Sequence, residues 1–403
     1  MKAVMYGGGN IGRGFIGALL SQSGYEVTFI DVAEPVIKSL NENHTYPVRY
    51  VSSEGYEDVW VKNISAVNGN DGDAAADVIA ECDIMATAVG ARILKFIVPN
   101  LVAGLRKRWA MNKGSLNIII CENLMDANKV LEGMLKEQLT AEEQLLFDQT
   151  VGLVEASIGR MVPVQTDEMK DGEPMRVCVE SYGFLPVDKD AFKGEIPKIT
   201  NMVPFSPFDF YIKRKLYVHN MGHATCAYLG GYLGMKYIWQ TMEDPDIVLI
   251  AQNAMLESAQ GLSRKYGADL DALQLHITDL LGRFTNQALK DTCERVGGDP
   301  ARKLSSADRL IGSSLLAMEQ DIRPTYTALG AAGAIYRYLQ ETQMPQTTEN
   351  ACKVLADISS LKDDHPLTQL ILAMYDLYLK GSRPAEMRKA AQMLKCSGLK
   401  NVI

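Results

Sequence analysis

Three residues whose combination can move a proton stand close together near the middle of the chain. Lys215, Asn220 and His223 lie in an otherwise apolar and aromatic stretch, Tyr211–Gly230 (YIKRKLYVHNMGHATCAYLG). In a regular α-helix Asn220 and His223 would lie about 60° apart on one face. Lys215 lies about 12 Å before His223 along such a helix, so it must reach forward or stand at a bent helix start.

This trio suits the oxidation of a secondary alcohol, in which a hydroxyl proton leaves as a hydride departs from the same carbon. A lysine can take the proton if burial lowers its pKa from about 10.4. An asparagine amide can donate to the developing alkoxide, and a histidine can hold a hydroxyl in place. The alternative is a solvated Lys215 beside an Asn220 and a His223 with structural partners only.

Length and composition favour a globular protein of two domains. The chain has 403 residues, which is longer than a single hydrophobic core normally supports. Its residues are 47% hydrophobic and 22% charged, which is typical of a globular protein. No stretch offers the roughly 20 apolar residues of a membrane span. A net charge of −8 argues against a nucleic-acid surface. The N-terminus has no basic-then-apolar leader, so we expect a cytoplasmic protein. Seven cysteines without CxxC pairs indicate reduced thiols rather than disulfides or a zinc site.

A glycine loop after the first predicted strand indicates dinucleotide binding. Strand Lys2–Tyr6 runs into a GxGxxG motif that opens a helix, Arg13–Ser21, and a second strand, Glu26–Ile30, follows. Glycines let the backbone approach a pyrophosphate, which the helix N-terminus stabilises. A tight glycine turn without a ligand is the alternative. The loop residues expected to bind the cofactor are Gly7, Gly9, Asn10, Ile11 and Gly12.

Asp31 predicts which cofactor is used. It ends the second strand, about 20 residues beyond the last glycine, where a carboxylate accepts hydrogen bonds from an adenosine ribose. The same charge would repel a 2′-phosphate, and Val32 and Ala33 follow it rather than an arginine. We therefore expect NAD rather than NADP.

Two later strands end in polar segments. Thr87–Gly90 closes a strand that begins at Asp83, and Asn123 follows strand Leu116–Cys121. Ligands gather at the carboxyl ends of parallel strands. We expect Thr87 and Val89 beside the cofactor and the Asn123 amide near a substrate oxygen, although a plain strand-to-helix turn would also explain Thr87–Gly90.

The pattern changes near Gly194. Strands are predicted at Val151–Glu155 and Met175–Glu180, whereas no persuasive strand follows Pro207. The sequence therefore predicts an α/β Rossmann-type domain over residues 1–194 and an all-α domain over residues 195–403. Helical periodicity recurs in Ile247–Arg264, Asp269–Leu281, Lys303–Met318, Thr325–Leu339, Thr348–Ser360 and Pro366–Lys380.

A turn in the helical half is rich in cations. Arg295, Arg302 and Lys303 flank a Gly-Gly-Asp-Pro sequence at positions 297–300. In an acidic chain such a cluster suits a phosphate or a carboxylate. The alternative is helix capping and surface ion pairs with Asp291, Glu294 and Asp308.

Together these motifs resemble the polyol-specific long-chain dehydrogenases over nearly the whole chain. The resemblance implies a zinc-independent, NAD-linked enzyme with Lys215 as general base, Asn123 and Asn220 as an oxyanion-type pair, and His223 binding substrate. The matching segments are Tyr6–Gly14, Thr87–Gly90, Cys121–Asn123, Lys215-x4-Asn220-x2-His223 and, as in the sugar-phosphate branch, Leu281–Phe284, Leu289–Asp291 and Arg302–Ser305.

The sugar-phosphate branch implies interconversion of mannitol 1-phosphate and fructose 6-phosphate. We expect no metal, nucleic-acid or membrane partner, and we expect a monomer. A hexuronate reductase, a free-polyol dehydrogenase and a non-catalytic NAD-binding regulator remain open. The sequence departs from the family pattern at three places. Gly159 precedes Arg160 where the family has an acid, Lys213 replaces a common acid, and Tyr182–Pro186 lacks the usual tryptophan.

Overall fold

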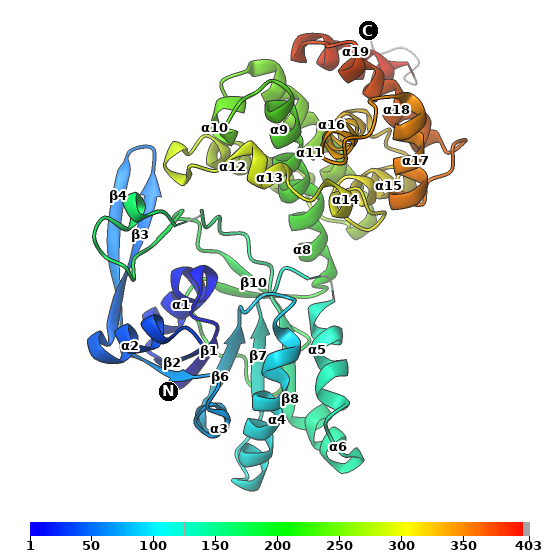
Figure 1. The fold of residues 1–403 in the computed structure, drawn as a ribbon. Helices are drawn as coiled ribbons and strands as arrows, with labels where there is room; N and C mark the ends of the chain where they lie inside the picture. The colour runs from blue at the N-terminus through cyan, green and yellow to red at the C-terminus, as the bar shows by residue number, and fades with distance from the viewer. Residues whose placement is uncertain (125, 164, 398–403) are drawn as a thin grey trace. The chain divides into compact units, whose positions relative to one another are not determined.

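The computed structural model describes residues 1–124, 126–163 and 165–397. The chain forms two compact units, Met1–Phe208 and Asp209–Ile403 (Figure 1). We expected a boundary near Gly194. The first unit continues to Phe208 because strand β11 (Met202–Phe205) pairs in parallel with β10 (Leu185–Asp188).

The first unit is built on a six-stranded parallel sheet, as predicted for a Rossmann-type domain. Its strand order is β5-β2-β1-β6-β7-β8. The order reverses between β1 and β6, and such switch points bind ligands at the carboxyl edge of the sheet. The strands are β1 (Lys2–Tyr6), β2 (Glu26–Asp31), β5 (Ile64–Asn68), β6 (Ile84–Thr87), β7 (Leu116–Ile120) and β8 (Val151–Glu155).

Helices cover this sheet because its strands are apolar on both faces. Met5 and Phe29 belong to one buried cluster, and Val4 and Ile30 to another. The helices of the unit are the π-helical turn η1 (Gly12–Ile16), α1 (Gly17–Gln22), α2 (Glu34–Asn43), α3 (Gly72–Glu81), α4 (Leu94–Ala110), α5 (Ala127–Lys136), α6 (Ala141–Thr150) and α7 (Asp167–Lys170).

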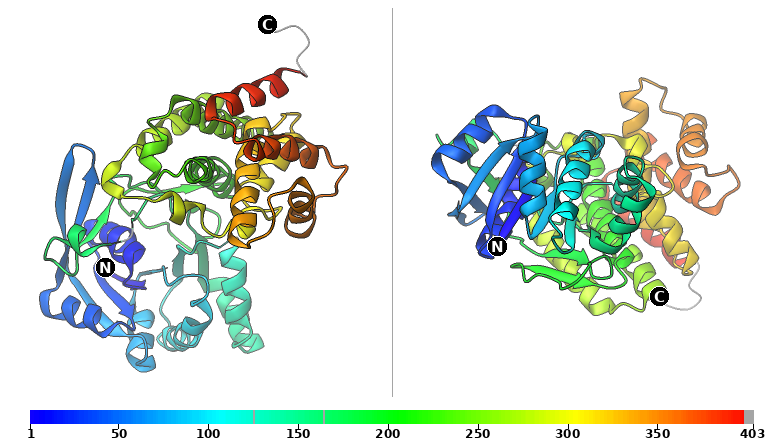
Figure 2. Two further views of the ribbon diagram at one scale, coloured as in Figure 1. Left: turned by 45° about the horizontal axis from the view of Figure 1, so that its top comes forward. Right: turned by 90° about the horizontal axis from the view of Figure 1, so that it is seen from below.

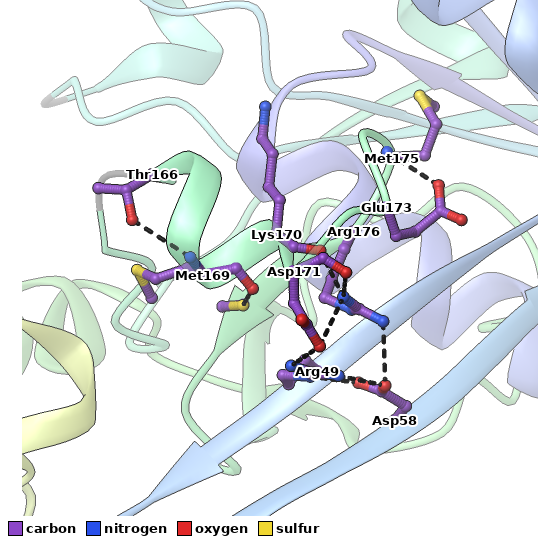
Figure 3. Close-up of polar contacts among 10 residues, drawn as sticks. Arg49, Asp58, Thr166, Met169, Lys170, Asp171, Glu173, Met175 and Arg176 are labelled. Atoms are coloured by element: carbon purple, nitrogen blue, oxygen red, sulfur yellow. Dashed lines mark hydrogen bonds and ion pairs between the residues drawn. The ribbon is translucent and has the colours of Figure 1, made fainter.

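The excursion after α2 forms a small second sheet, β4 (Gly55–Lys62), β3 (Thr45–Ser52) and β9 (Val177–Val179). An arginine–aspartate cluster ties these strands together (Figure 3). Arg49 makes two hydrogen bonds of 2.7 Å to the Asp58 carboxylate, and Arg176 Nη2 lies 3.3 Å from Asp58 Oδ2. Because both arginines are buried, the paired carboxylates offset the cost of removing their charges from water.

The second unit is helical, and its described residues contain no strand, as predicted. Helix α9 is apolar almost all round and is buried among neighbouring helices (Figure 2). The predicted helix Lys303–Met318 is two helices, α14 and α15, separated by a turn. The helices are α8 (Asp209–Arg214), the π-helix η2 (Lys215–Asn220), α9 (Met221–Tyr232), α10 (Ile238–Thr241), α11 (Pro245–Tyr266), α12 (Leu270–Phe284), η3 (Gln287–Leu289), α13 (Cys293–Gly297), α14 (Pro300–Lys303), α15 (Ile311–Glu319), α16 (Thr325–Glu341), α17 (Thr348–Ser359), α18 (Pro366–Leu379) and α19 (Pro384–Cys396).

Within the described ranges, no helix has the length and apolar character needed to cross a membrane.

Candidate active site

The glycine loop after β1 has the geometry of a phosphate cradle. Gly7 has a φ of +102°, which favours glycine. A Cβ on Gly12 would lie 1.9 Å from the Gly7 carbonyl oxygen, so the helix can start against the loop only with glycine there. A Cβ on Gly9 would meet no described atom within 4 Å. The helix begins at Asn10 and Ile11, and the open backbone before it fits a pyrophosphate group.

Asp31 is fixed beside this loop at the end of β2. Its Oδ2 accepts a hydrogen bond from the backbone N–H of Gly8 at 2.6 Å, and its Oδ1 accepts from Val32 and Ala33 at 2.8 and 2.9 Å. The carboxylate therefore holds a defined position at the carboxyl edge of the sheet, where an acid that binds a ribose is expected.

Glu122, for which the sequence predicted no role, organises the next part of this edge. Its Oε1 accepts from the N–H of Val89 at 3.0 Å and its Oε2 from the N–H of Gly90 at 2.7 Å. Thr87 is fully buried at the end of β6, whereas Asn123 is exposed after β7. The sequence feature that could have predicted this role is the position of Glu122 between the end of a strand and Asn123. A polar side chain at that position can reach the adjacent strand.

In the second unit, the stretch with the candidate base is a π-helix rather than a regular α-helix. Residues Lys215–Asn220 form η2, which continues into α9. Hydrogen bonds in a π-helix span five residues, so its angular spacing differs from that of an α-helix, and π-segments often occur at functional sites. The rise of about 12 Å expected between Lys215 and His223 in a regular α-helix therefore does not apply, whereas Asn220 and His223 are joined by the first turn of α9. Lys215 and Asn220 are both half-buried.

His223 lies on α9 against an aromatic ring and a carboxylate. Its ring stacks on Phe284, with centroids 4.7 Å apart and planes 14° apart. Its Nε2 lies 3.1 Å from Asp291 Oδ2, although the N–H direction is not aligned for a regular hydrogen bond. Burial alone would raise the pKa of Asp291, but contact with His223 and the charge of Arg295 outweigh burial and lower that pKa.

His219, one turn before His223, is buried and has a different electrostatic role. Burial, the charge of Arg283 and the neighbouring His223 lower the pKa of His219 well below its ordinary value. A neutral imidazole at this position adds no positive charge beside Lys215. The four-residue spacing between the two histidines was the sequence signal for this pair.

The cations of the 295–303 turn have different surroundings. Arg295 makes two hydrogen bonds to Asp291 Oδ1, at 2.9 and 2.6 Å. Arg302 contacts Asp299 Oδ2 at 2.9 Å and Asp308 Oδ2 at 3.1 Å. For these two arginines, the contacts match the structural alternative to an anion site, namely helix capping and ion pairs with nearby acids.

Lys303 differs from both arginines because it is 4% exposed and makes no ion pair with any described residue. Burial, followed by the charges of Arg309 and Arg302, lowers the pKa of Lys303 to about 8. A buried, unpaired cation can stabilise an entering anion, because an anion offsets the cost of burying the charge.

The positions that depart from the family pattern have structural partners. Lys213 Nζ contacts Asp209 Oδ2 and the Tyr266 hydroxyl, each at 2.9 Å. A Cβ on Gly159 would lie 3.0 Å from Tyr182 Cε1. Two of the departures thus meet in space, since the Tyr182 ring occupies the volume that a side chain at position 159 would need.

Comparison with known proteins identifies the family. Residues 1–201 match the mannitol dehydrogenase Rossmann domain and residues 208–380 the mannitol dehydrogenase C-terminal domain. The chain belongs to the mannitol dehydrogenase family of oxidoreductases. Membership in the mannitol dehydrogenase family confirms the resemblance to polyol dehydrogenases and the fold class predicted from the sequence.

One relative is similar along most of its length. The mannitol-1-phosphate 5-dehydrogenase of Brevibacillus brevis is 36% identical over 377 residues, covering 92% of this chain and 96% of that protein. The relatedness therefore extends through both units.

Two solved structures share the fold of this chain. The Pseudomonas fluorescens mannitol 2-dehydrogenase ternary complex with NAD and D-mannitol has a TM-score of 0.76 and 14% identity, covering 98% of this chain and 94% of that one. A substrate-free D-sorbitol dehydrogenase has a TM-score of 0.78 and 13% identity, covering 96% and 94%. At such low identity these structures support the fold alone.

Proposed function

We propose that this protein interconverts mannitol 1-phosphate and fructose 6-phosphate by NAD-linked, metal-independent hydride transfer. The proposal rests on the relative with 36% identity and on the Lys215, Asn220 and His223 stretch of the second unit. The observation that carries it is the continuous π-to-α helix. Along this helix stand the half-buried amine of Lys215, the half-buried amide of Asn220 and then His223, which contacts the Asp291 carboxylate.

The residues have complementary roles in the oxidation direction. Lys215 Nζ takes the proton of the substrate hydroxyl as the carbon–oxygen bond becomes a carbonyl, and later releases that proton to solvent. Asn220 donates a hydrogen bond to the developing alkoxide. His223 holds a substrate hydroxyl. NAD, when bound by the glycine loop and Asp31, supplies the acceptor for the hydride.

For the phosphate we propose Lys303 as the principal contact, with Arg302 and Arg295 as further cations. Lys303 is the least neutralised of the three, since the arginines already contact carboxylates. The segment that follows this turn contacts the π-helix within the second unit. The Tyr217 hydroxyl donates to the Ala307 carbonyl at 3.3 Å, and a Cβ on Gly312 would lie 2.7 Å from that hydroxyl.

A substrate panel followed through NADH absorbance tests the proposal. We expect fructose 6-phosphate to be reduced far faster than fructose, and mannitol 1-phosphate to be oxidised with NAD. Higher kcat/KM with a hexuronate would assign the cations to a carboxylate. A preference for free fructose would indicate a free-polyol dehydrogenase, and the absence of turnover with every substrate would favour a binding protein.

A further inference from the structure

We propose that Asp291 is a positioning residue that fixes the tautomer and orientation of His223, so that Nδ1 accepts a substrate hydroxyl. The inference rests on the proposed role of His223. Its geometric basis is the 3.1 Å approach of His223 Nε2 to Asp291 Oδ2. Both side chains are largely buried, with 12% and 8% exposed, so the contact is weakly screened by water.

Asp291 is itself held in place before any ligand binds. Its backbone carbonyl accepts from the N–H of Ile238 at 2.9 Å, and two residues later the N–H of Cys293 donates to the Lys236 carbonyl at 2.9 Å. Its Oδ1 receives both hydrogen bonds of Arg295, one turn along the chain. Arg295 thus occupies one carboxylate oxygen and leaves the other for His223.

The histidine ring has limited freedom to choose another partner. Stacking on Phe284 restricts its plane, and a carboxylate with a lowered pKa can only accept a hydrogen bond. In a neutral ring the proton therefore belongs on Nε2, and Nδ1 carries the lone pair. Hydrogen bonds in active sites commonly align only when substrate binds, which accounts for the imperfect direction of the contact.

Nitrogen chemical shifts of histidine-labelled protein, recorded at mildly alkaline pH, test the tautomer independently of turnover. We expect the Nε2–H tautomer for His223 in the wild type and a mixture of tautomers in Asp291→Asn. An Nδ1–H tautomer in the wild type would overturn the proposal. This outcome is measured on the wild type alone, so it decides the question even if Asp291→Asn does not fold. An absence of fructose 6-phosphate turnover by the wild type would overturn the proposed function instead.

A double-mutant cycle gives the kinetic test. Asp291→Asn should lower kcat/KM about 10–100-fold, the range for losing one charge-assisted hydrogen bond. It should cause little further loss in a His223→Ala background, because the two residues act as a unit. The control is Glu341→Gln, which breaks an exposed pair with Arg337 four residues away and should leave kcat/KM unchanged. Fully additive losses for Asp291→Asn and His223→Ala would contradict the coupling.

Discussion

The Asp31 carboxylate accepts a hydrogen bond of 2.6 Å from the backbone N–H of Gly8. This contact joins the end of β2 to the glycine loop after β1, so one side chain supports both the proposed ribose contact and the loop proposed to hold the pyrophosphate. Because the carboxylate is held by backbone donors, its position does not depend on a neighbouring flexible side chain.

Removing this carboxylate should alter cofactor choice. We expect Asp31→Ala to lower kcat/KM for NAD about 10–100-fold, since a ribose acceptor is lost, while NADP use rises relative to NAD because the repelling charge is gone. Kinetics with both cofactors provide the measurement. Equal use of NAD and NADP by the wild type would contradict the proposed preference.

Lys215 should be required for the chemical step. Lys215→Ala should lower kcat by about 10²–10⁴-fold, the usual contribution of a general base, and should retain NADH binding measured by fluorescence titration. Lys213→Ala is the matched control in the same stretch, since Lys213 contacts Asp209 and Tyr266. Normal turnover of Lys215→Ala at saturating cofactor would show that another residue is the base.

The proposed phosphate contacts can be tested by comparing a substrate that carries a phosphate with one that does not. Lys303→Met and Arg302→Ala should each raise KM for fructose 6-phosphate about 10–100-fold, as expected for one charge-assisted contact, and should hardly change KM for fructose. The measurement is the ratio of the two KM values. Equal losses for both sugars would assign these cations to the fold.

Phosphate binding should also weaken at alkaline pH. Because Lys303 has a pKa of about 8, it loses its charge as the pH rises through that value. KM for fructose 6-phosphate should therefore increase about tenfold between about pH 7 and 9, relative to KM for fructose. Lys303→Met should abolish this increase, and an unchanged slope in that variant would exclude Lys303 as its source.

The stability of the second unit should fall in acid because of His276. Burial, then the charges of Arg214 and Arg283, lowers its pKa to about 3, whereas an unfolded chain has a histidine pKa near about 6.5. Between these values the unfolded state binds the extra proton, so unfolding free energy decreases as the pH falls, by at most about 1.4 kcal/mol per pH unit. Urea unfolding across this range should show a shallower pH dependence for His276→Gln; the same slope as the wild type would contradict this role.

The sequence by itself determined the features that depend on local spacing. The glycine loop, Asp31 and the strand ends at Thr87 and Asn123 follow from a strand-loop-helix order whose geometry is set within a few residues. Helical periodicity likewise predicted most of the second unit, because an amphipathic face repeats along the chain.

Only the tertiary structure decided the surroundings of the candidate catalytic groups. Lys215–Asn220 forms a π-helix, whereas the expected spacing of Lys215, Asn220 and His223 assumed a regular α-helix. In this helix Tyr217 packs against Gly312, almost a hundred positions later. Asp291 lies in contact with His223. Lys303 is buried and makes no ion pair with a described residue, whereas Arg302 donates hydrogen bonds to Asp299 and Asp308. Burial and contacts between distant segments set these charges and orientations, and neither quantity is encoded in the spacing of neighbouring residues.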